Sequence, residues 1–189
     1  MTSPEWVQLP SAPQLTDGGN LVLRLPQTGD VNDIVAYARD PEMVRWTTVP
    51  VPYRIADASD FVQAATEGWH ADIARFAIEY QGRFAGGTHL RFNDRGRADV
   101  GYGLAPWARG QGVMTRALRL VLAWGFELPG LEVVDWESVE GNWSSRRVAQ
   151  RCGFRMDGTA LGRAERRGFR RNAWTASLRR GEPLTGRHG

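Results

Sequence analysis

The residues best suited to chemistry lie where a predicted strand, residues 98–104, gives way to a predicted helix, residues 110–127. Glycines occupy positions 110 and 112 at this junction. The first turn of a helix presents unpaired N–H groups and a partial positive charge, and both favour a bound phosphate. Glycine lets a diphosphate approach the backbone closely. The junction therefore predicts an anion site, although two glycines also suit a tight turn that binds nothing.

Charges around the same junction favour an anion. A helix normally prefers Asp or Glu in its first turn, because the helix dipole rewards negative charge there. The first two turns here contain no acid, and the basic residues nearby are Arg109, Arg116 and Arg119. Residues 95–189 carry 17 arginines against 9 acids, which fits a polyanionic ligand in this half of the chain. The alternative is that arginine simply keeps the surface soluble.

Several reaction classes are excluded by residues that the chain lacks. All 24 basic residues are arginine, so there is neither a phosphate-loop lysine nor a Schiff-base lysine. One cysteine and three widely separated histidines give no metal-ligand spacing, and no GxSxG motif indicates a serine hydrolase. The dinucleotide fingerprint GxGxxG also fails, because position 115 is threonine. We therefore expect no metal site.

Two motifs, in the right order and spacing, resemble those of the GNAT superfamily of acyl-CoA-dependent N-acyltransferases. RGQGVM, from Arg109 to Met114, is similar to the acetyl-CoA pyrophosphate loop, although Met114 replaces the usual small residue. NWSSRRVAQRCGF, from Asn142 to Phe154, is similar to the second signature. The resemblance covers about residues 20–179, and the pattern is similar to the branch that contains the ribosomal-protein-alanine N-acetyltransferases.

The resemblance implies an α/β fold of the α+β kind, with a mixed, mostly antiparallel central sheet flanked by helices. Its fourth and fifth strands would splay apart, helped by a bulge near Gly101–Gly103. The pantetheine arm of acetyl-CoA, the co-substrate, would enter the opening and pair with exposed backbone. The residues implied to bind it are Leu104, Arg109, Gly110, Gln111, Gly112, Val113, Met114, Thr115 and Asn142.

Three side chains are implied or proposed for proton transfer. The hydroxyl at the position of Ser145 would protonate the leaving thiolate, or alternatively bond only to the local backbone. Glu165 would act as the base, or as a surface ion pair among its arginine neighbours. Glu137, on the strand that lines the opening, is the rival base. Tyr102 could relay a proton but is also suited to packing, and His89 is most simply interpreted as a satisfied sheet residue.

The elements that must position these residues follow from periodicity and turn signals. The pattern predicts helices at residues 29–39, 55–70, 110–127 and 143–152. It predicts strands at residues 21–25, 75–80, 83–92, 98–104, 131–138, from 154 and at 172–178. Residues 45–52, with two prolines, are expected to form a loop. In the helix after the glycines, the predicted core stripe is Met114, Ala117, Leu118, Val121, Leu122 and Gly125.

The whole chain, residues 1–189, is expected to be a single domain whose ordered core spans about residues 20–179, with loose ends at 1–15 and 181–189. No apolar run is long enough to span a membrane, and a single cysteine favours the cytoplasm. We expect an acetyl-CoA-dependent N-acetyltransferase that acts on a primary amine of a protein N-terminus or a small molecule. The chain would be a monomer or a homodimer, and would meet nucleic acid only through the ribosome. The alternatives are a non-catalytic CoA- or RNA-binding module and a domain that binds another nucleotide.

Overall fold

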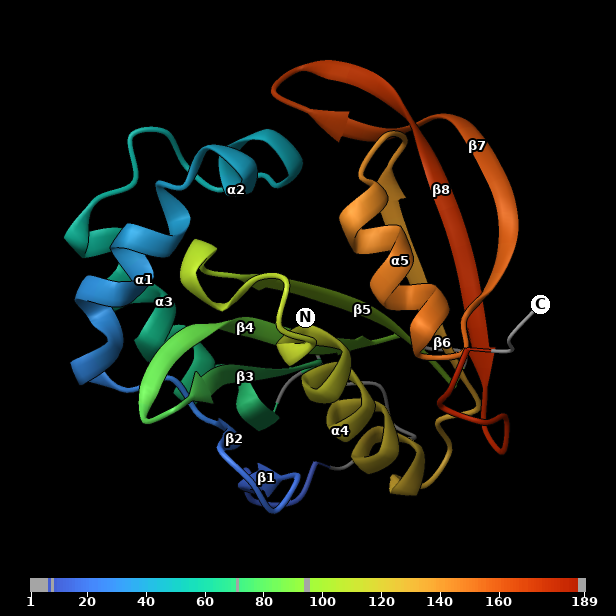
Figure 1. The fold of residues 1–189 in the computed structure, drawn as a ribbon, viewed down its shortest axis with the longest axis horizontal. Helices are drawn as coiled ribbons and strands as arrows, with labels where there is room; N and C mark the ends of the chain where they lie inside the picture. Colours follow the sequence, from blue (N-terminus) through green and yellow to red (C-terminus); the bar gives the residue numbers. More distant parts are fainter. Residues whose placement is uncertain (1–6, 8, 71, 94–95, 187–189) are drawn as a thin grey trace.

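A computed structural model describes residues 7, 9–70, 72–93 and 96–186 of the chain. The sheet formed by these residues has the strand order β1-β2-β3-β4-β5-β6-β8-β7, and helices cover both of its faces (Figure 1). Its strands are β1 Leu15–Thr16, β2 Leu21–Arg24, β3 Ile73–Tyr80, β4 Arg83–Phe92, β5 Arg97–Leu104, β6 Val133–Val139, β7 Arg155–Arg166 and β8 Phe169–Arg179. The helices are α1 Val31–Ala38, α2 Pro41–Trp46, α3 Ile55–Glu67, α4 Val113–Glu127 and α5 Trp143–Arg151, with short 3₁₀ turns at Thr28–Asp30, Gly68–His70 and Pro106–Ala108.

The helices pack on the sheet through two separate cores. One core joins α1 and α3 to β3 and β4 through residues such as Ile34, Ala58 and Phe84. The other joins α4 to the opposite face, and the six residues of its predicted stripe are all buried. Because successive strand residues point to opposite faces, Ala77 belongs to the first core and its neighbours on β3 belong to the second.

The strand pairing confirms the mixed, mostly antiparallel sheet. Only β5 and β6, among the described strands, pair in parallel, and their pairing runs from Arg97–Val133 to Val100–Trp136. Beyond these residues the two strands continue without pairing to each other. The sheet is therefore split at the carboxyl ends of β5 and β6, as the resemblance implied.

The predicted bulge near Gly101–Gly103 is wrong in position. The register of β4 with β5 is regular from Phe92–Ala98 to Gly86–Leu104. The irregularity instead falls between β3 and β4, where Ile78 faces Gly86 but Glu79 faces Phe84, which leaves one extra residue in β4. The split between β5 and β6 thus needs no bulge in β5.

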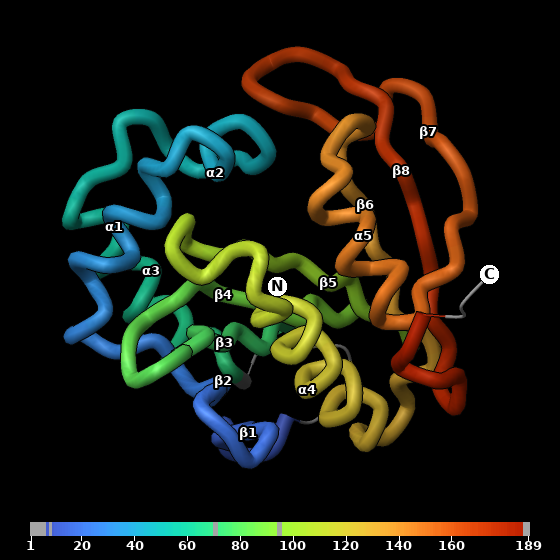
Figure 2. Tube along the Cα trace, in the orientation of Figure 1, coloured from blue at the N-terminus to red at the C-terminus, as the bar shows by residue number. Residues whose placement is uncertain are grey.

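Several elements differ from the sequence-based expectations. Residues 41–46 form α2, because Asp40 accepts a hydrogen bond from the Met43 N–H and Pro41 suits the first helical position. The helix expected from residue 110 begins at Val113, since Gly110 and Gly112 both have positive φ angles. The last two strands are longer than expected and form one long hairpin, β7–β8 (Figure 2). In the expected loose end, Gly186 N–H donates to the Arg151 carbonyl.

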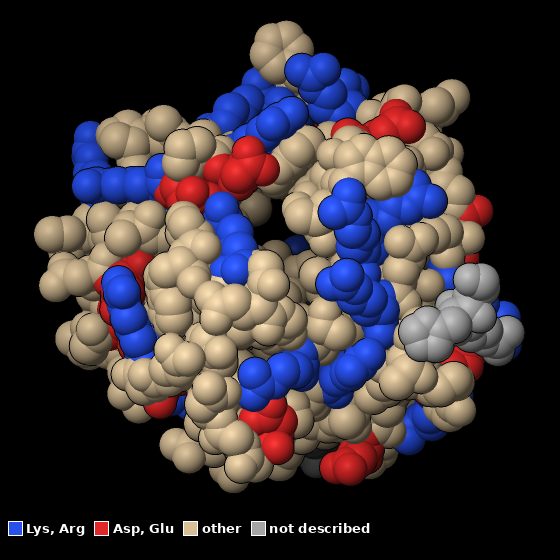
Figure 3. Space-filling model, in the orientation of Figure 1, with Lys and Arg blue, Asp and Glu red and all other residues tan. Residues whose placement is uncertain are grey.

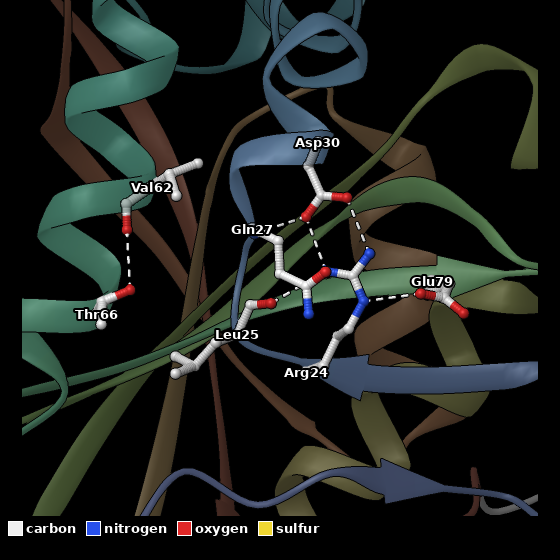
Figure 4. Close-up of polar contacts among 7 residues, drawn as sticks. All are labelled: Arg24, Leu25, Gln27, Asp30, Val62, Thr66 and Glu79. Carbon is white, nitrogen blue, oxygen red and sulfur yellow. Dashed lines mark hydrogen bonds and ion pairs between the residues drawn. The ribbon is translucent and has the colours of Figure 1, made fainter.

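A buried ion cluster ties β2 and β3 to the start of α1 (Figure 4). The Arg24 guanidinium donates to both Asp30 oxygens, at 2.7 and 2.8 Å, and its Nε donates to Glu79 at 2.7 Å. Asp30 also accepts from the Gln27 N–H. Burial alone would raise the pKa of Asp30, but these hydrogen bonds and the Arg24 charge outweigh burial and lower it.

Candidate functional site

The loop before α4 has the geometry of an open backbone cradle. Gly110 and Gly112 adopt φ angles of 75° and 74°, which glycine reaches without strain. A Cβ atom at either position would meet nothing within 4 Å, so space lies directly above the loop. Val113, Met114 and Thr115 are buried, and their packing holds the first turn of α4 in place. The N–H groups of this turn are thus the part of the loop available to an anion.

The arginines near this loop have partners within the protein, so the charge mismatch seen in the sequence has a structural explanation. Arg116 donates to Asp17 and Asn20, and Arg119 donates to the carbonyls of Leu184 and Arg151. Arg109 donates to the Leu104 carbonyl and pairs with Asp40 at the start of α2. The Gln111 side chain likewise donates to the Trp107 carbonyl. These arginines therefore do not need a bound anion to balance their charge.

The split between β5 and β6 exposes backbone on its β5 side. The Ala105 N–H donates to the Ala85 carbonyl of β4 at 2.8 Å. Because peptide groups of an antiparallel strand alternate in direction, those of Leu104 and Tyr102 face β6. The contact of the Leu104 carbonyl with Arg109, rather than with β4, agrees with this direction. An extended molecule in the split would therefore meet hydrogen-bonding groups along β5.

The start of α5 lies at the other side of the split. Asn142 is the N-cap, and its Oδ1 accepts from the Ser145 N–H at 3.2 Å and from the Ser144 hydroxyl at 3.0 Å. Because Oδ1 makes these capping bonds, the amide nitrogen of Asn142 takes no part in the cap. Ser145 Oγ accepts from the Trp136 indole at 3.2 Å. The serine hydroxyl is therefore anchored to β6 and keeps its own proton for another acceptor.

Tyr102 connects β5 to the same helix start. Its hydroxyl donates to the Ser145 carbonyl at 2.8 Å, and burial raises its pKa well above the ordinary value. The phenol is therefore protonated near neutral pH and acts as a donor. Tyr102 thus helps to hold the backbone of Ser145 in place. The sequence had left the role of Tyr102 open between packing and proton relay.

Three side chains from other elements pack against glycines of β5, on the face of the sheet away from α4. A Cβ atom at Gly103 would lie 2.9 Å from Met43 Sδ and closer still to the Tyr37 hydroxyl. One at Gly101 would lie 2.7 Å from His89 Nε2. The Tyr37 hydroxyl, the Met43 side chain and the His89 ring thus lie directly against the β5 backbone. We call Tyr37, Met43 and His89 the glycine-seated cluster. The pattern of alternate glycines in β5 was the only sequence signal for it.

The two proposed bases lie in different surroundings. Glu137 is on β6, one residue beyond the last pair with β5, and accepts from Arg163 Nε. Glu165 is exposed near the end of β7, where the hairpin turns. The structure therefore brings Glu137 to the split, together with Ser145 and Leu104, and places Glu165 on the hairpin.

The β7–β8 hairpin reaches across to α2. Arg166 donates to the Trp46 carbonyl, and Arg167 donates to the carbonyls of Val44 and Val49. Figure 3 shows a hollow between the surface over α5 and the surface over α1 and α2, with arginines along its α5 side. The sequence run of arginines from residue 163 to 171 thus partly serves to join the hairpin to α2 above this hollow.

Two other features bear on cofactors. No group of three His, Cys, Asp or Glu in the described ranges is placed to hold a metal ion. A cavity of about 680 Å³ lies between α4, the end of α5 and residues 182–186, and its lining includes Arg119, Arg147, Arg151 and Arg155.

No helix of the described residues is long and apolar enough to cross a membrane.

Comparison with known proteins agrees with the fold and the two motifs. The model of a family described as an acetyltransferase (GNAT) domain matches residues 20–155. No curated protein matches the sequence.

Solved structures give the same architecture at low sequence identity. One is the ribosomal L7/L12 alpha-N-protein acetyltransferase RimL with coenzyme A, at 17% identity and a TM-score of 0.80, covering 88% of this chain and 98% of that chain. Another is the microcin C7 self-immunity acetyltransferase MccE with acetyl-CoA and AMP. It has 18% identity and a TM-score of 0.79, and the match covers 87% of this chain and 98% of that chain. A third is Mycobacterium smegmatis RimJ in complex with CoA-disulfide, at 20% and 0.77, covering 95% and 90%.

Proposed function

Because the chain belongs to the GNAT acetyltransferase family, we propose that it transfers an acetyl group from acetyl-CoA to a primary amine. The observation that carries the proposal is the split between β5 and β6 beyond the Val100–Trp136 pair, next to the open loop before α4. An elongated co-substrate with a diphosphate at one end and a thioester at the other fits this combination.

The diphosphate would accept hydrogen bonds from N–H groups between Arg109 and Thr115. Support comes from the positive φ angles of the two glycines and the open space above them. The nearby arginines would act by holding the loop, since they already bond to other protein groups. The arginine-lined cavity between α4 and α5 offers positive charge to the remaining phosphate of CoA.

The pantetheine arm would lie in the split and pair with β5 as an added strand. The N–H groups of Leu104 and of Tyr102, two residues earlier on β5, would stabilise negative charge on the thioester oxygen. The Asn142 amide nitrogen would hold the arm from the α5 side. We draw this assignment from the directions of the β5 peptide groups and the capping bonds of Asn142.

The amine would attack the carbonyl carbon directly, and the enzyme would contribute position and proton transfer. As the C–S bond breaks, the Ser145 hydroxyl would give its proton to the CoA thiolate. The Trp136 indole would favour this direction, because it donates to Ser145 Oγ and leaves the serine proton free. The acceptor is a protein N-terminus or a small-molecule amine.

A CoA-release assay with purified protein, acetyl-CoA and a panel of amines tests the proposal. The panel contains peptides with free N-termini, polyamines and amino acids, and each product is identified by its mass gain of one acetyl group. We expect turnover on at least one member. Calorimetric binding of CoA with no turnover on any amine would instead favour a non-catalytic binding module.

A further inference from the structure

His89 occupies a position at the point where β5 and β6 part. His89 lies on β4, between β3 and β5. It pairs in register with Arg75 of β3 on one side and with Gly101 of β5 on the other. Gly101 is the first β5 residue after the last pair with β6. Cross-strand partners share a face of the sheet, so the imidazole lies on the face away from α4, over the base of the split.

Only glycine at position 101 permits this placement. A Cβ atom there would lie 2.7 Å from His89 Nε2 and 3.2 Å from Nδ1, well inside van der Waals contact. The Cε1 edge of the ring, between the two nitrogens, therefore lies against the β5 backbone at Gly101, next to the peptide group of Tyr102. In the proposed function, on which this inference rests, that peptide group lines the thioester.

Both ring nitrogens of His89 are available to a ligand. Within the described residues, neither nitrogen makes a hydrogen bond, and neither is a buried atom without a partner, because the side chain is only half-buried. A histidine that merely completed the sheet would use a nitrogen to bond a neighbour. His89 instead keeps a donor and an acceptor free beside the split.

We propose that His89 is a catalytic residue that accepts the proton of the attacking amine. The amine nitrogen forms a bond to the thioester carbon, and its proton passes to the free imidazole nitrogen. The C–S bond breaks, and the departing thiolate takes a proton on the α5 side. The imidazolium then returns its proton to solvent and Ser145 regains a proton from solvent, so the products are the amide and CoA thiol.

The surroundings of His89 keep its ring unprotonated before the reaction. Burial, with the charges of Arg91 and Arg75, lowers its pKa to about 4, so the ring is neutral at pH 7. As a weak base it accepts the proton only once the C–N bond forms and makes the amine nitrogen acidic. The acids on the same face of the sheet are Asp99 on β5, which is in register with Arg91, and Asp135 and Glu137 on β6, which pair with Arg97 and Arg163. Neutral Tyr37 of α1 lies one rung away.

The test uses the full-length protein and the amine that it acetylates. We expect His89→Gln to lower kcat by about 100-fold, with the Kd for CoA and the Tm unchanged. We expect His89→Ala to lose activity similarly and to regain a large part of it with added imidazole, because the space over Gly101 is then free for the base. The same imidazole must not accelerate the wild type or Ser145→Ala.

The outcomes separate this proposal from the proposed function. Wild-type turnover with unchanged kcat in His89→Gln would overturn the role of His89 alone. Failure of imidazole to rescue a folded, CoA-binding His89→Ala would also overturn it. No turnover by the wild type on any amine would overturn the proposed function and this inference together.

Discussion

At the scale of single residues, Ser145 is the side chain whose chemistry is most constrained by its neighbours. Its N–H bonds to the Asn142 cap, its carbonyl accepts from Tyr102 and its Oγ accepts from Trp136. All three contacts fix the hydroxyl without using its proton. This arrangement suits a donor to a leaving group that carries negative charge only in the transition state.

We predict that Ser145→Ala slows acetyl transfer at least about tenfold with little change in the Kd for CoA, as expected for a contact made in the transition state. Steady-state kinetics and calorimetry measure the two effects. Ser144→Ala is the matched control, because that neighbouring hydroxyl only bonds the Asn142 side chain. A fully active Ser145→Ala would remove this residue from the mechanism.

The loop before α4 and the Asn142 cap could be located from the sequence more readily than the glycine-seated cluster. Residues 109–115 and Asn142 are contiguous motifs, so spacing alone locates the loop and the cap. The glycine-seated cluster comes from α1, α2 and β4, and only strand register brings it to β5. His89 therefore looked like an ordinary sheet residue, since nothing in the local sequence shows that its cross-strand partner is glycine.

At the scale of elements, the contact between β4 and β5 is as tight as a core contact. The His89 ring occupies the volume that any side chain at position 101 would need. This close approach explains why glycine stands in the middle of a strand, where it is otherwise unfavourable.

We predict that Gly101→Ala lowers the free energy of unfolding by about 1–3 kcal/mol, the usual range for overpacking. The double variant Gly101→Ala with His89→Ala should recover most of this loss, because the ring that clashes is gone. Urea unfolding of the four proteins forms a double-mutant cycle. Additive effects of the two substitutions would contradict the described packing.

Periodicity located most elements, but short helices and strand ends depended on tertiary contacts. The loop expected at residues 45–52 overlaps the end of α2, whose start was signalled by Asp40 and Pro41. The six residues of α2 are held by the Arg109–Asp40 pair and by the β7–β8 hairpin, which local sequence does not show. The β7–β8 hairpin is also longer than predicted. Charged residues fill much of β7, so its length depends on pairing with β8 rather than on an apolar pattern.

At the scale of the whole molecule, the two cores and the ion cluster of Arg24, Asp30 and Glu79 hold the sheet and α1 in one unit. Asp30 and Arg24 are both buried. Removing one partner of a buried pair leaves a charge without compensation. The fold class followed from the motifs and the order of elements, whereas this cluster joins residues up to 55 positions apart and was not predicted.

We predict that Asp30→Asn destabilises the protein by about 3 kcal/mol at pH 7. The folded-state pKa of Asp30 is lowered, so its stabilising effect is full above the unfolded pKa of about 3.9 and declines as the pH falls below it. Urea unfolding of both proteins from pH 7 to pH 3 should show a gap that narrows toward pH 3. A gap that stays constant with pH would contradict the ion cluster.

The most direct test of the account is a crystal structure of the protein with millimolar CoA. We predict that the diphosphate lies within hydrogen-bond distance of N–H groups between Arg109 and Thr115, with the pantetheine arm between β5 and β6 and its thiol end near Tyr102. An empty loop, or CoA bound elsewhere with the β5–β6 split closed by protein side chains, would contradict it.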